Sequence, residues 1–272
     1  MINKIIFPTD FSDNAAKAMH FAGEVAQFTG AELLLLHAQH VPVVDVQDAA
    51  MIMDNAMHEL KEQSVAEITR LKEILERDYY LKKVTTSVDF GFARDLIIDK
   101  AEETDADLVI MGTKGSSNIL DNLLGGVTAN VMKAIKKPLL VVPAEAHYQK
   151  FKKIAFASVL DNQDMEQLEW FADFTKIFNP EMHLLHVIDD GKVLNESQRA
   201  VLDEMGHKFN KMFFEPLAGS SIAHSIEEYI ESEKIELLAL RAGERNFFED
   251  LFHNSVTKHI AMHTKTPLII FH

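Results

Sequence analysis

The chain has 272 residues, with 42 acidic and 27 basic side chains, a formal net charge of −15 and no cysteine. The missing cysteines exclude disulfides, thiolate metal sites and cysteine nucleophiles, and the acidity disfavours binding to nucleic acid or anionic lipid. No apolar run approaches the roughly 20 residues that span a bilayer, and Asp10 and Asp13 interrupt any signal-like segment. We therefore expect a cytoplasmic globular protein that binds neither membrane nor nucleic acid.

The first half of the chain alternates short apolar runs with helical patterns. Apolar runs of the kind buried on both faces predict strands at 4–8, 33–36, 84–88, 107–110 and 138–142. Helical periodicity predicts helices after Ser12, over 47–79, from Gly91 onward and over 127–135. Ser12 can cap the first helix and Gly30 can end it. This order predicts a parallel sheet flanked by helices, with ligands at the carboxyl ends of its strands.

Four glycines surround the loop that follows the fourth predicted strand. Gly112 and Gly115 come just after the strand, and Gly125 and Gly126 come just before a helix. Glycine lets backbone N–H groups approach a ligand, and the first turn of a helix offers unpaired N–H donors and a positive dipole end. The pattern therefore predicts a phosphate site. The alternative is that these glycines only allow tight turns.

The spacing of these glycines resembles the nucleotide-binding signature of the universal stress protein family, Gly-x2-Gly-x9-Gly followed by Ser or Thr. The flanking segments 4–12, 30–33 and 137–143 are also similar to that family. One position departs from the pattern, because Gly126 stands where the family has Ser or Thr. A hydroxyl expected to contact phosphate is therefore absent, while the backbone N–H remains.

The resemblance also implies which residues hold a nucleotide. Residues 8–10 would contact the nucleoside, Ala38 would lie against the adenine, and Met111 would border the sugar. The implied cofactor-binding residues are Pro8, Thr9, Asp10, Ala38, Met111, Gly112, Gly115, Gly125, Gly126, Val127 and Thr128. The implied ligand is ATP or a related adenine nucleotide. If ATP is bound, Mg²⁺ or Mn²⁺ is expected to bridge its phosphates.

The pattern restarts after the polar stretch 144–150. Residues 153–156 and 183–187 repeat 4–7 and 34–38 at an offset of 149, whereas the later strand matches have an offset of 129. The second copy is therefore 20 residues shorter, mostly at the long helix. We predict two copies of one domain, 1–145 and 146–272. By resemblance, they are two tandem open parallel five-stranded sheets flanked by helices, Rossmann-like and adenine nucleotide alpha hydrolase-like.

The second copy does not keep the glycine motif. At the same offset, Gly112, Gly115 and Gly125 become Arg241, Glu244 and Asn254, and Asp10 becomes Val159 at the earlier offset. We expect no nucleotide there, because side chains block backbone approach and Glu244 repels phosphate. The resemblance implies that the copies pair as an intramolecular pseudo-dimer through strands 138–142 and 267–271. A homodimer of whole chains is left open.

The sequence provides no convincing catalytic group. No Gly-x-Ser-x-Gly motif surrounds its serine pairs. His259 and His263 are four residues apart on a predicted helix and could share a metal, but the sequence shows no third ligand near them, so no metal site is predicted. His37 and His186 recur at equivalent strand ends, where a structural hydrogen bond explains them more simply than catalysis.

Two functional hypotheses of different classes remain. The first is a tandem universal stress protein that binds an adenine nucleotide in its N-terminal domain as a sensor or stress-response factor. The second is a nucleotide-independent interaction protein of the same fold, which Gly126 and the altered second copy favour. Slow ATP hydrolysis would need a general base that the sequence does not show, so enzymatic activity is not expected.

Overall fold

A computed structural model describes residues 2–40, 50–113, 125–188, 193–209, 211–219, 221–242 and 256–272. The chain divides into two compact groups of residues, 2–137 and 138–272. The α/β class and the mostly parallel strand pairing that the sequence predicts are confirmed.

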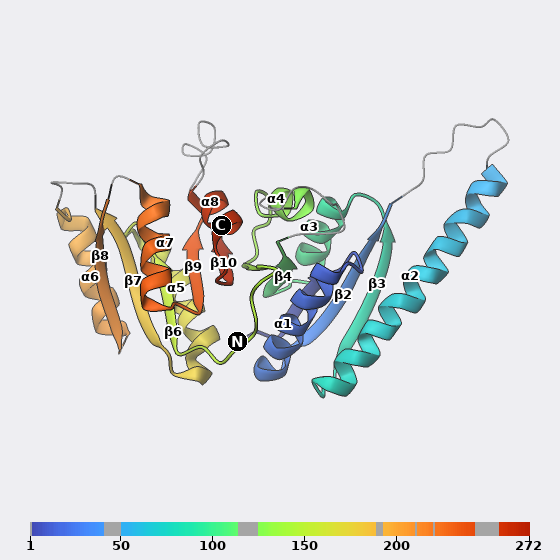
Figure 1. The fold of residues 1–272 in the computed structure, drawn as a ribbon, viewed down its shortest axis with the longest axis horizontal. Coiled ribbons are helices and arrows are strands. Elements are labelled where there is room, and N and C mark those ends of the chain that lie inside the picture. Colours follow the sequence, from blue (N-terminus) through green and yellow to red (C-terminus); the bar gives the residue numbers. More distant parts are fainter. Residues whose placement is uncertain are drawn as a thin grey trace. The chain divides into compact units, whose positions relative to one another are not determined.

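The first group is a parallel sheet with helices on both faces (Figure 1). Its strands stand in the order β3-β2-β1-β4. The order reverses direction beside β1, so right-handed crossovers place the helices before and after the reversal on opposite faces. The elements are β1 (Lys4–Pro8), α1 (Asp13–Thr29), β2 (Glu32–Gln39), α2 (Ala50–Asp78), β3 (Val84–Phe90), α3 (Ala93–Glu103), β4 (Leu108–Gly112) and α4 (Gly126–Val131).

The second group repeats this arrangement and adds one antiparallel strand. Its strands stand in the order β5-β10-β9-β6-β7-β8. β5 runs antiparallel to β10, with Val141 opposite Leu268 and Leu139 opposite Ile270. The elements are β5 (Leu139–Val142), β6 (Lys153–Ala157), α5 (Asn162–Thr175), a 3-10 turn η1 (Lys176–Phe178), β7 (Glu181–Ile188), α6 (Glu196–Lys208), β8 (Met212–Ala218), α7 (Ile222–Glu233), β9 (Leu237–Arg241), α8 (Val256–His263) and β10 (Leu268–Phe271).

This antiparallel pair is the one that the family resemblance implied for 138–142 and 267–271. β5 belongs to the compact group 138–272, in which it pairs with β10. The predicted domain boundary falls after residue 145 and would instead assign β5 to the first domain. That boundary stays a prediction, because strand pairing and the unit of repetition in the sequence need not coincide.

Local sequence determines the helix ends where caps are present. The Ser12 hydroxyl accepts a hydrogen bond from the Ala15 N–H at 3.2 Å, and Gly30 ends α1 with a left-handed φ of 72°. α4 is shorter than the predicted 127–135 and ends at Val131. After Val131 the chain tightens into a turn, in which the Ala134 N–H donates to the Val131 carbonyl at 3.0 Å, so the helix stops before the apolar periodicity does.

In both copies a carboxylate binds backbone N–H groups at the start of the first strand. The Asp107 carboxylate accepts hydrogen bonds from the backbone N–H groups of Asn3 and Lys4, at 2.7 and 3.0 Å. Glu236 does the same for Lys152 and Lys153 in the second copy. α2 has 29 residues and its counterpart α6 has 13, so this helix accounts for most of the predicted shortening.

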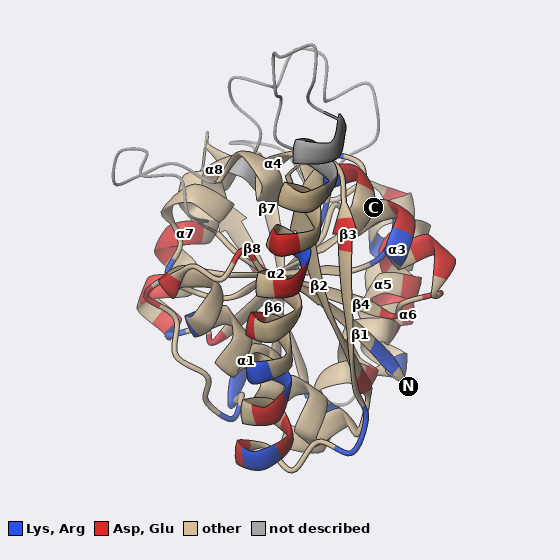
Figure 2. Ribbon diagram, turned by 90° about the vertical axis from the view of Figure 1, so that its right-hand side faces the viewer, with Lys and Arg blue, Asp and Glu red and all other residues tan. Residues whose placement is uncertain are grey.

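Charged residues of both signs alternate along α2 (Figure 2). Lys72 lies 3.6 Å from Glu76, and Arg70 lies 3.4 Å from Glu67. Such solvent-exposed pairs add little to stability. Among the described helices, none combines the length and the apolar character that crossing a membrane requires.

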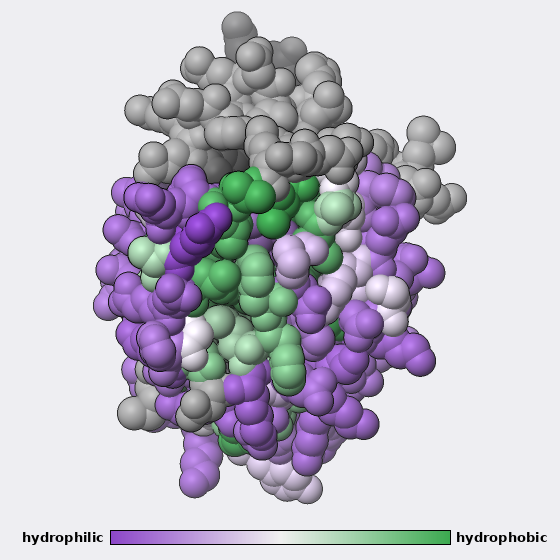
Figure 3. All heavy atoms as spheres, turned by 90° about the vertical axis from the view of Figure 1, so that its left-hand side faces the viewer, coloured by the Kyte–Doolittle hydropathy of each residue, from purple (hydrophilic) through white to green (hydrophobic). Residues whose placement is uncertain are grey.

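β8 ends the strand order of the second group, on a face where apolar residues gather among hydrophilic ones (Figure 3). Phe213, in this strand, is 48% exposed. Pro216 lies in the same strand opposite His186 and has no N–H to offer a further strand. The proline therefore protects this edge against unwanted strand addition.

Gly23 in α1 lies close against the ring of Tyr79. A Cβ at this position in α1 would lie 2.8–2.9 Å from ring atoms of Tyr79. The Tyr79 hydroxyl is itself held 2.6 Å from Nδ1 of His20, and burial raises its pKa. The ring therefore has little freedom to move away.

We expect Gly23→Ala to lower the free energy of unfolding by about 2 kcal/mol, because overpacking outweighs the gain in helix propensity. Gly206→Ala in α6 is the matched control, since nothing lies within 4 Å of its added Cβ. The control should be neutral or stabilising by about 0.5 kcal/mol. Urea unfolding followed by circular dichroism measures both, and equal effects would contradict the proposed contact.

Candidate functional site

A cavity opens at the carboxyl ends of β1, β2 and β4, beside the reversal in strand order. Parallel α/β sheets bind ligands at such switch points. The described residues that line it are Pro8, Thr9, Asp10, Ala15, Leu36, Ala38, Ala93, Ile97, Met111, Gly112, Val127 and Thr128. Eight of the eleven residues implied by the glycine motif and the family resemblance therefore meet at one cavity.

The remaining three implied residues do not line the cavity in the described part of the chain. Gly115 lies outside the described residues. Gly125 and Gly126 begin α4 but are not among the lining residues. The structure also adds four lining residues that the sequence reasoning missed: Ala15, Leu36, Ala93 and Ile97. Ala93 and Ile97 lie in α3, and the position of this helix after a strand of the same sheet was the signal that could have revealed them.

The loop after β1 is held by backbone hydrogen bonds to β2. The Thr9 N–H donates to the Leu36 carbonyl at 2.9 Å, and Nδ1 of His37 donates to the Thr9 carbonyl at 2.8 Å. Phe11 follows with a left-handed φ of 61°, and its ring stacks on His37 with centroids 4.3 Å apart. His37 thus has the structural role expected for it, and it fixes the direction in which residues 9 and 10 enter the cavity.

Asp10 has a local role as well as a place in the cavity wall. Its Oδ1 accepts hydrogen bonds from the Ser12 N–H at 3.1 Å and from the Ser12 hydroxyl at 2.6 Å. The carboxylate therefore orients the serine that caps α1. It also lines the cavity, so the turn places an acidic group beside mostly apolar walls.

Two hydrogen bonds join the end of β4 to the start of α4. The buried Thr128 hydroxyl donates to the Gly112 carbonyl at 2.9 Å. The Gly125 N–H donates to the Thr113 carbonyl at 2.7 Å. These bonds place the end of the strand and the first turn of the helix beside one another.

The second of these bonds bears on how many N–H donors the predicted phosphate cradle can offer. The Gly125 amide is used by a main-chain carbonyl and is not available to a ligand. The first N–H groups of α4, from Gly126 to Thr128, have no acceptor within the helix. α4 has only six residues, so it supplies few aligned peptide dipoles. Anion binding would depend on individual amides and on the missing Cβ of Gly112.

The second copy preserves the backbone of this site. The Ser158 N–H donates to the Leu185 carbonyl at 2.9 Å, and Nδ1 of His186 donates to the Ser158 carbonyl at 2.9 Å. Leu160 has a φ of 61°, as does Phe11 in the first copy. The repeat that the sequence offsets predicted is therefore present down to individual hydrogen bonds.

The chemistry of the second copy is different because Arg241 replaces Gly112. Its guanidinium binds Asp161 and Gln163, and its Nε donates to Asp164 at 3.1 Å. Asp164 is 1% exposed and also accepts hydrogen bonds from the Ser158 hydroxyl at 2.5 Å and from two backbone N–H groups. In the second copy, an arginine–aspartate network stands where the first copy has a glycine beside a cavity.

Comparisons with known proteins show similarity to one family. The model of the universal stress protein family matches residues 1–143. Universal stress protein MJ0577 of Methanocaldococcus jannaschii is 29% identical over 156 residues, covering 52% of this chain and 95% of its own length. Universal stress protein Slr1230 of Synechocystis sp. is 22% identical over 281 residues, covering 98% and 88%. A universal stress protein structure from Archaeoglobus fulgidus is similar in fold alone, with a TM-score of 0.73, 18% identity and coverage of 99% and 96%.

We expect Arg241→Met to lower the free energy of unfolding of the second copy by about 3 kcal/mol, because it leaves the buried Asp164 carboxylate without its cation. Trp170, the only tryptophan, lies in α5 of this copy, so urea unfolding followed by its fluorescence reports the change. Lys208→Ala removes the half-exposed ion pair with Glu169 and should cost less than about 1 kcal/mol. Similar losses in the two variants would show that the network is not a buried ion pair in solution.

Proposed function

The chain belongs to the universal stress protein family, and on that premise we propose that its first copy binds an adenine nucleotide, with ATP as the leading candidate. The protein would act in a stress response as a nucleotide-dependent sensor. One observation carries the proposal: residues from β1, β2, β4 and α4, chosen for a nucleotide from the sequence, line one cavity at the switch point of the sheet.

The walls of this cavity suit the parts of a nucleotide. Leu36, Ala38 and Ile97 offer apolar surface for a base, and Asp10 offers an acceptor for polar groups of the nucleoside. Gly112 presents backbone without a Cβ at the end of β4, and the first turn of α4 lies beside it. Mg²⁺ or Mn²⁺ would enter with the phosphates of ATP. The proposal is limited to the first copy, because Arg241 and its partners stand at the equivalent position in the second.

The same cavity argues for binding rather than catalysis. Asp10 is the one titratable side chain among the described residues that line it. Its carboxylate already accepts two hydrogen bonds from Ser12. General-base catalysis needs a group positioned on the attacking water, and these residues offer no second candidate. We therefore do not propose that ATP hydrolysis is the function.

A nucleotide-independent interaction protein is the second candidate. It is favoured by the absent hydroxyl at Gly126 and by the Gly125 amide, whose donor is used within the loop. Both features reduce the number of groups that can hold phosphate. The two candidates differ in whether the purified protein carries or binds a nucleotide.

If the first copy binds ATP, mass spectrometry of the denatured purified protein should reveal an adenine nucleotide, and added ATP with Mg²⁺ should raise the melting temperature. A ligand at 100 times its dissociation constant stabilises by about 2.7 kcal/mol. Gly112→Ala should abolish this shift, because its Cβ occupies space beside the phosphates. Gly206→Ala, which lies in α6 and is not among the described residues that line the cavity, should retain it. Absence of both bound nucleotide and a thermal shift in the unaltered protein would favour the interaction protein.

Gly126→Ser should increase the affinity for ATP about tenfold, since it restores a hydroxyl that can donate to charged phosphate oxygens. A side chain fits here, because nothing lies within 4 Å of an added Cβ. Gly126→Ala is the matched control, with the same backbone effect and no hydroxyl. Isothermal titration calorimetry compares the three proteins. Equal gains for serine and alanine would assign the effect to the backbone and not to a phosphate contact.

A further inference from the structure

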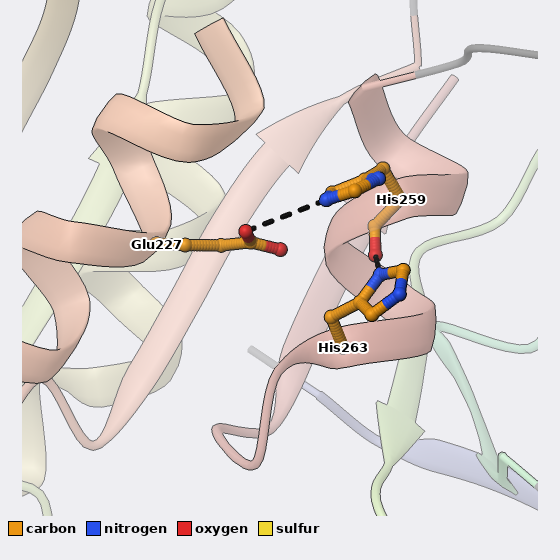
Figure 4. A group of neighbouring side chains, drawn as sticks. All are labelled: Glu227, His259 and His263. Atoms are coloured by element: carbon orange, nitrogen blue, oxygen red, sulfur yellow. Dashed lines mark hydrogen bonds and ion pairs between the residues drawn. The ribbon is translucent and has the colours of Figure 1, made fainter. Parts of the chain in front are cut away.

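We propose that Glu227, His259 and His263 form a binding site for a divalent transition-metal ion, with Zn²⁺ as the best match. The sequence placed the two histidines one turn apart but showed no third ligand near them. The structure supplies it from another helix, because α7 and α8 pack together and bring Glu227 to the histidines of α8 (Figure 4). One ligand atom from each of the three residues lies within 4.8 Å of the other two.

The distance between His259 and Glu227 suits two ligands of one ion. Nε2 of His259 lies 3.4 Å from Oε2 of Glu227, which is longer than an ordinary N–H···O hydrogen bond. Two ligand atoms bound tetrahedrally to zinc, at its usual bond lengths of about 2.0–2.2 Å, are separated by about 3.4 Å. The pair is therefore spaced so that an ion can enter without moving it apart.

The hydrogen bond of His263 selects the tautomer that a metal needs. Its Nδ1 lies 2.8 Å from the His259 carbonyl, and a carbonyl oxygen can only accept, so Nδ1 carries the proton. In the neutral ring the lone pair is then on Nε2. Metal-binding histidines commonly donate their other N–H to a backbone carbonyl in this way. Both histidines are exposed, so their rings can turn to close the remaining distance.

Glu227 provides the observation that an ordinary ion pair does not explain. Its side chain is 20% exposed, and its Oε1 is buried without a hydrogen-bond partner among the described residues. An unsatisfied buried acceptor costs about 1–3 kcal/mol. The 3.4 Å contact with His259 involves Oε2 and leaves Oε1 unpaired among the described residues. A cation held by this carboxylate would compensate the buried Oε1.

The surroundings leave room for a hydrated ion. Glu227 and His263 border a cavity of ≈ 430 Å³. Its other lining residues include carboxylates and amines: Glu228, Glu231, Lys234 and Lys265. Two histidines and one carboxylate are a ligand set typical of zinc with an open fourth position for water, and the nitrogen ligands disfavour Mg²⁺ and Ca²⁺. The site lies wholly in the second copy, so it is independent of the proposed nucleotide cavity.

The test is calorimetric titration of the full-length, chelator-treated protein with Zn²⁺ in the absence of nucleotide. We expect one Zn²⁺ per chain, and we expect Glu227→Gln and His263→Ala each to weaken binding about tenfold or more. His58→Ala is the matched control, because His58 is an exposed histidine 3.3 Å from Glu62 and belongs to no such cluster in the described chain. It should bind Zn²⁺ like the unaltered protein. Trp170 fluorescence without metal verifies that each variant is folded.

A second readout is the visible absorption of the Co²⁺-substituted protein, whose intensity distinguishes four-coordinate from six-coordinate cobalt. We expect the four-coordinate spectrum, and its loss in His263→Ala. The proposal is overturned if Zn²⁺ does not bind, or if Glu227→Gln and His263→Ala bind as tightly as His58→Ala. It is also overturned if Gly112→Ala removes Zn²⁺ binding, since the ion would then lie in the first copy.

Discussion

The pairing of β1 with β4 is the constraint on which the first copy depends. The paired residues, such as Ile5 and Leu108, are about a hundred positions apart in the chain. The Asp107 carboxylate reinforces the pairing by accepting from two backbone N–H groups at the start of β1. Because parallel strands end at the same edge of the sheet, this register carries Thr9 and Gly112 to one place. The cavity exists because the crossovers on either side of this pair leave in opposite directions.

The two copies share the backbone around the site but differ in the side chains that occupy it. His37 and His186 make the same hydrogen bond to a strand-end carbonyl, so the two copies share the backbone of the site. One residue, at the end of β4 in the first copy and of β9 in the second, then decides what fills the space. Gly112 leaves it open, whereas Arg241 fills it with a guanidinium bound to a buried carboxylate. Function on a common fold resides in such positions and not in the fold itself.

Backbone amides at this site serve two competing purposes. A buried N–H must find an acceptor, and the loop around β4 uses the Thr113 carbonyl for Gly125. The amide that closes the loop cannot also bind phosphate. The glycine motif therefore identifies where the chain approaches the cavity, but it overestimates how many donors remain for a ligand. Buried acceptors also need partners, and the buried Oε1 of Glu227 has none among the described residues. The proposed metal ion would compensate it.

The sequence by itself determined the α/β class, the repeat and most strand positions, because buried parallel strands leave continuous apolar runs and a repeat leaves constant offsets. The family resemblance, which rests on the glycine spacing and the flanking segments, also implied eight residues that line the cavity. Only the tertiary structure decided the rest. α3 reaches the cavity with Ile97, Arg241 meets Asp164, and Glu227 joins His259 through contacts between segments distant in sequence. Side-chain partners across helices and strands depend on packing, and no local pattern in the chain records them.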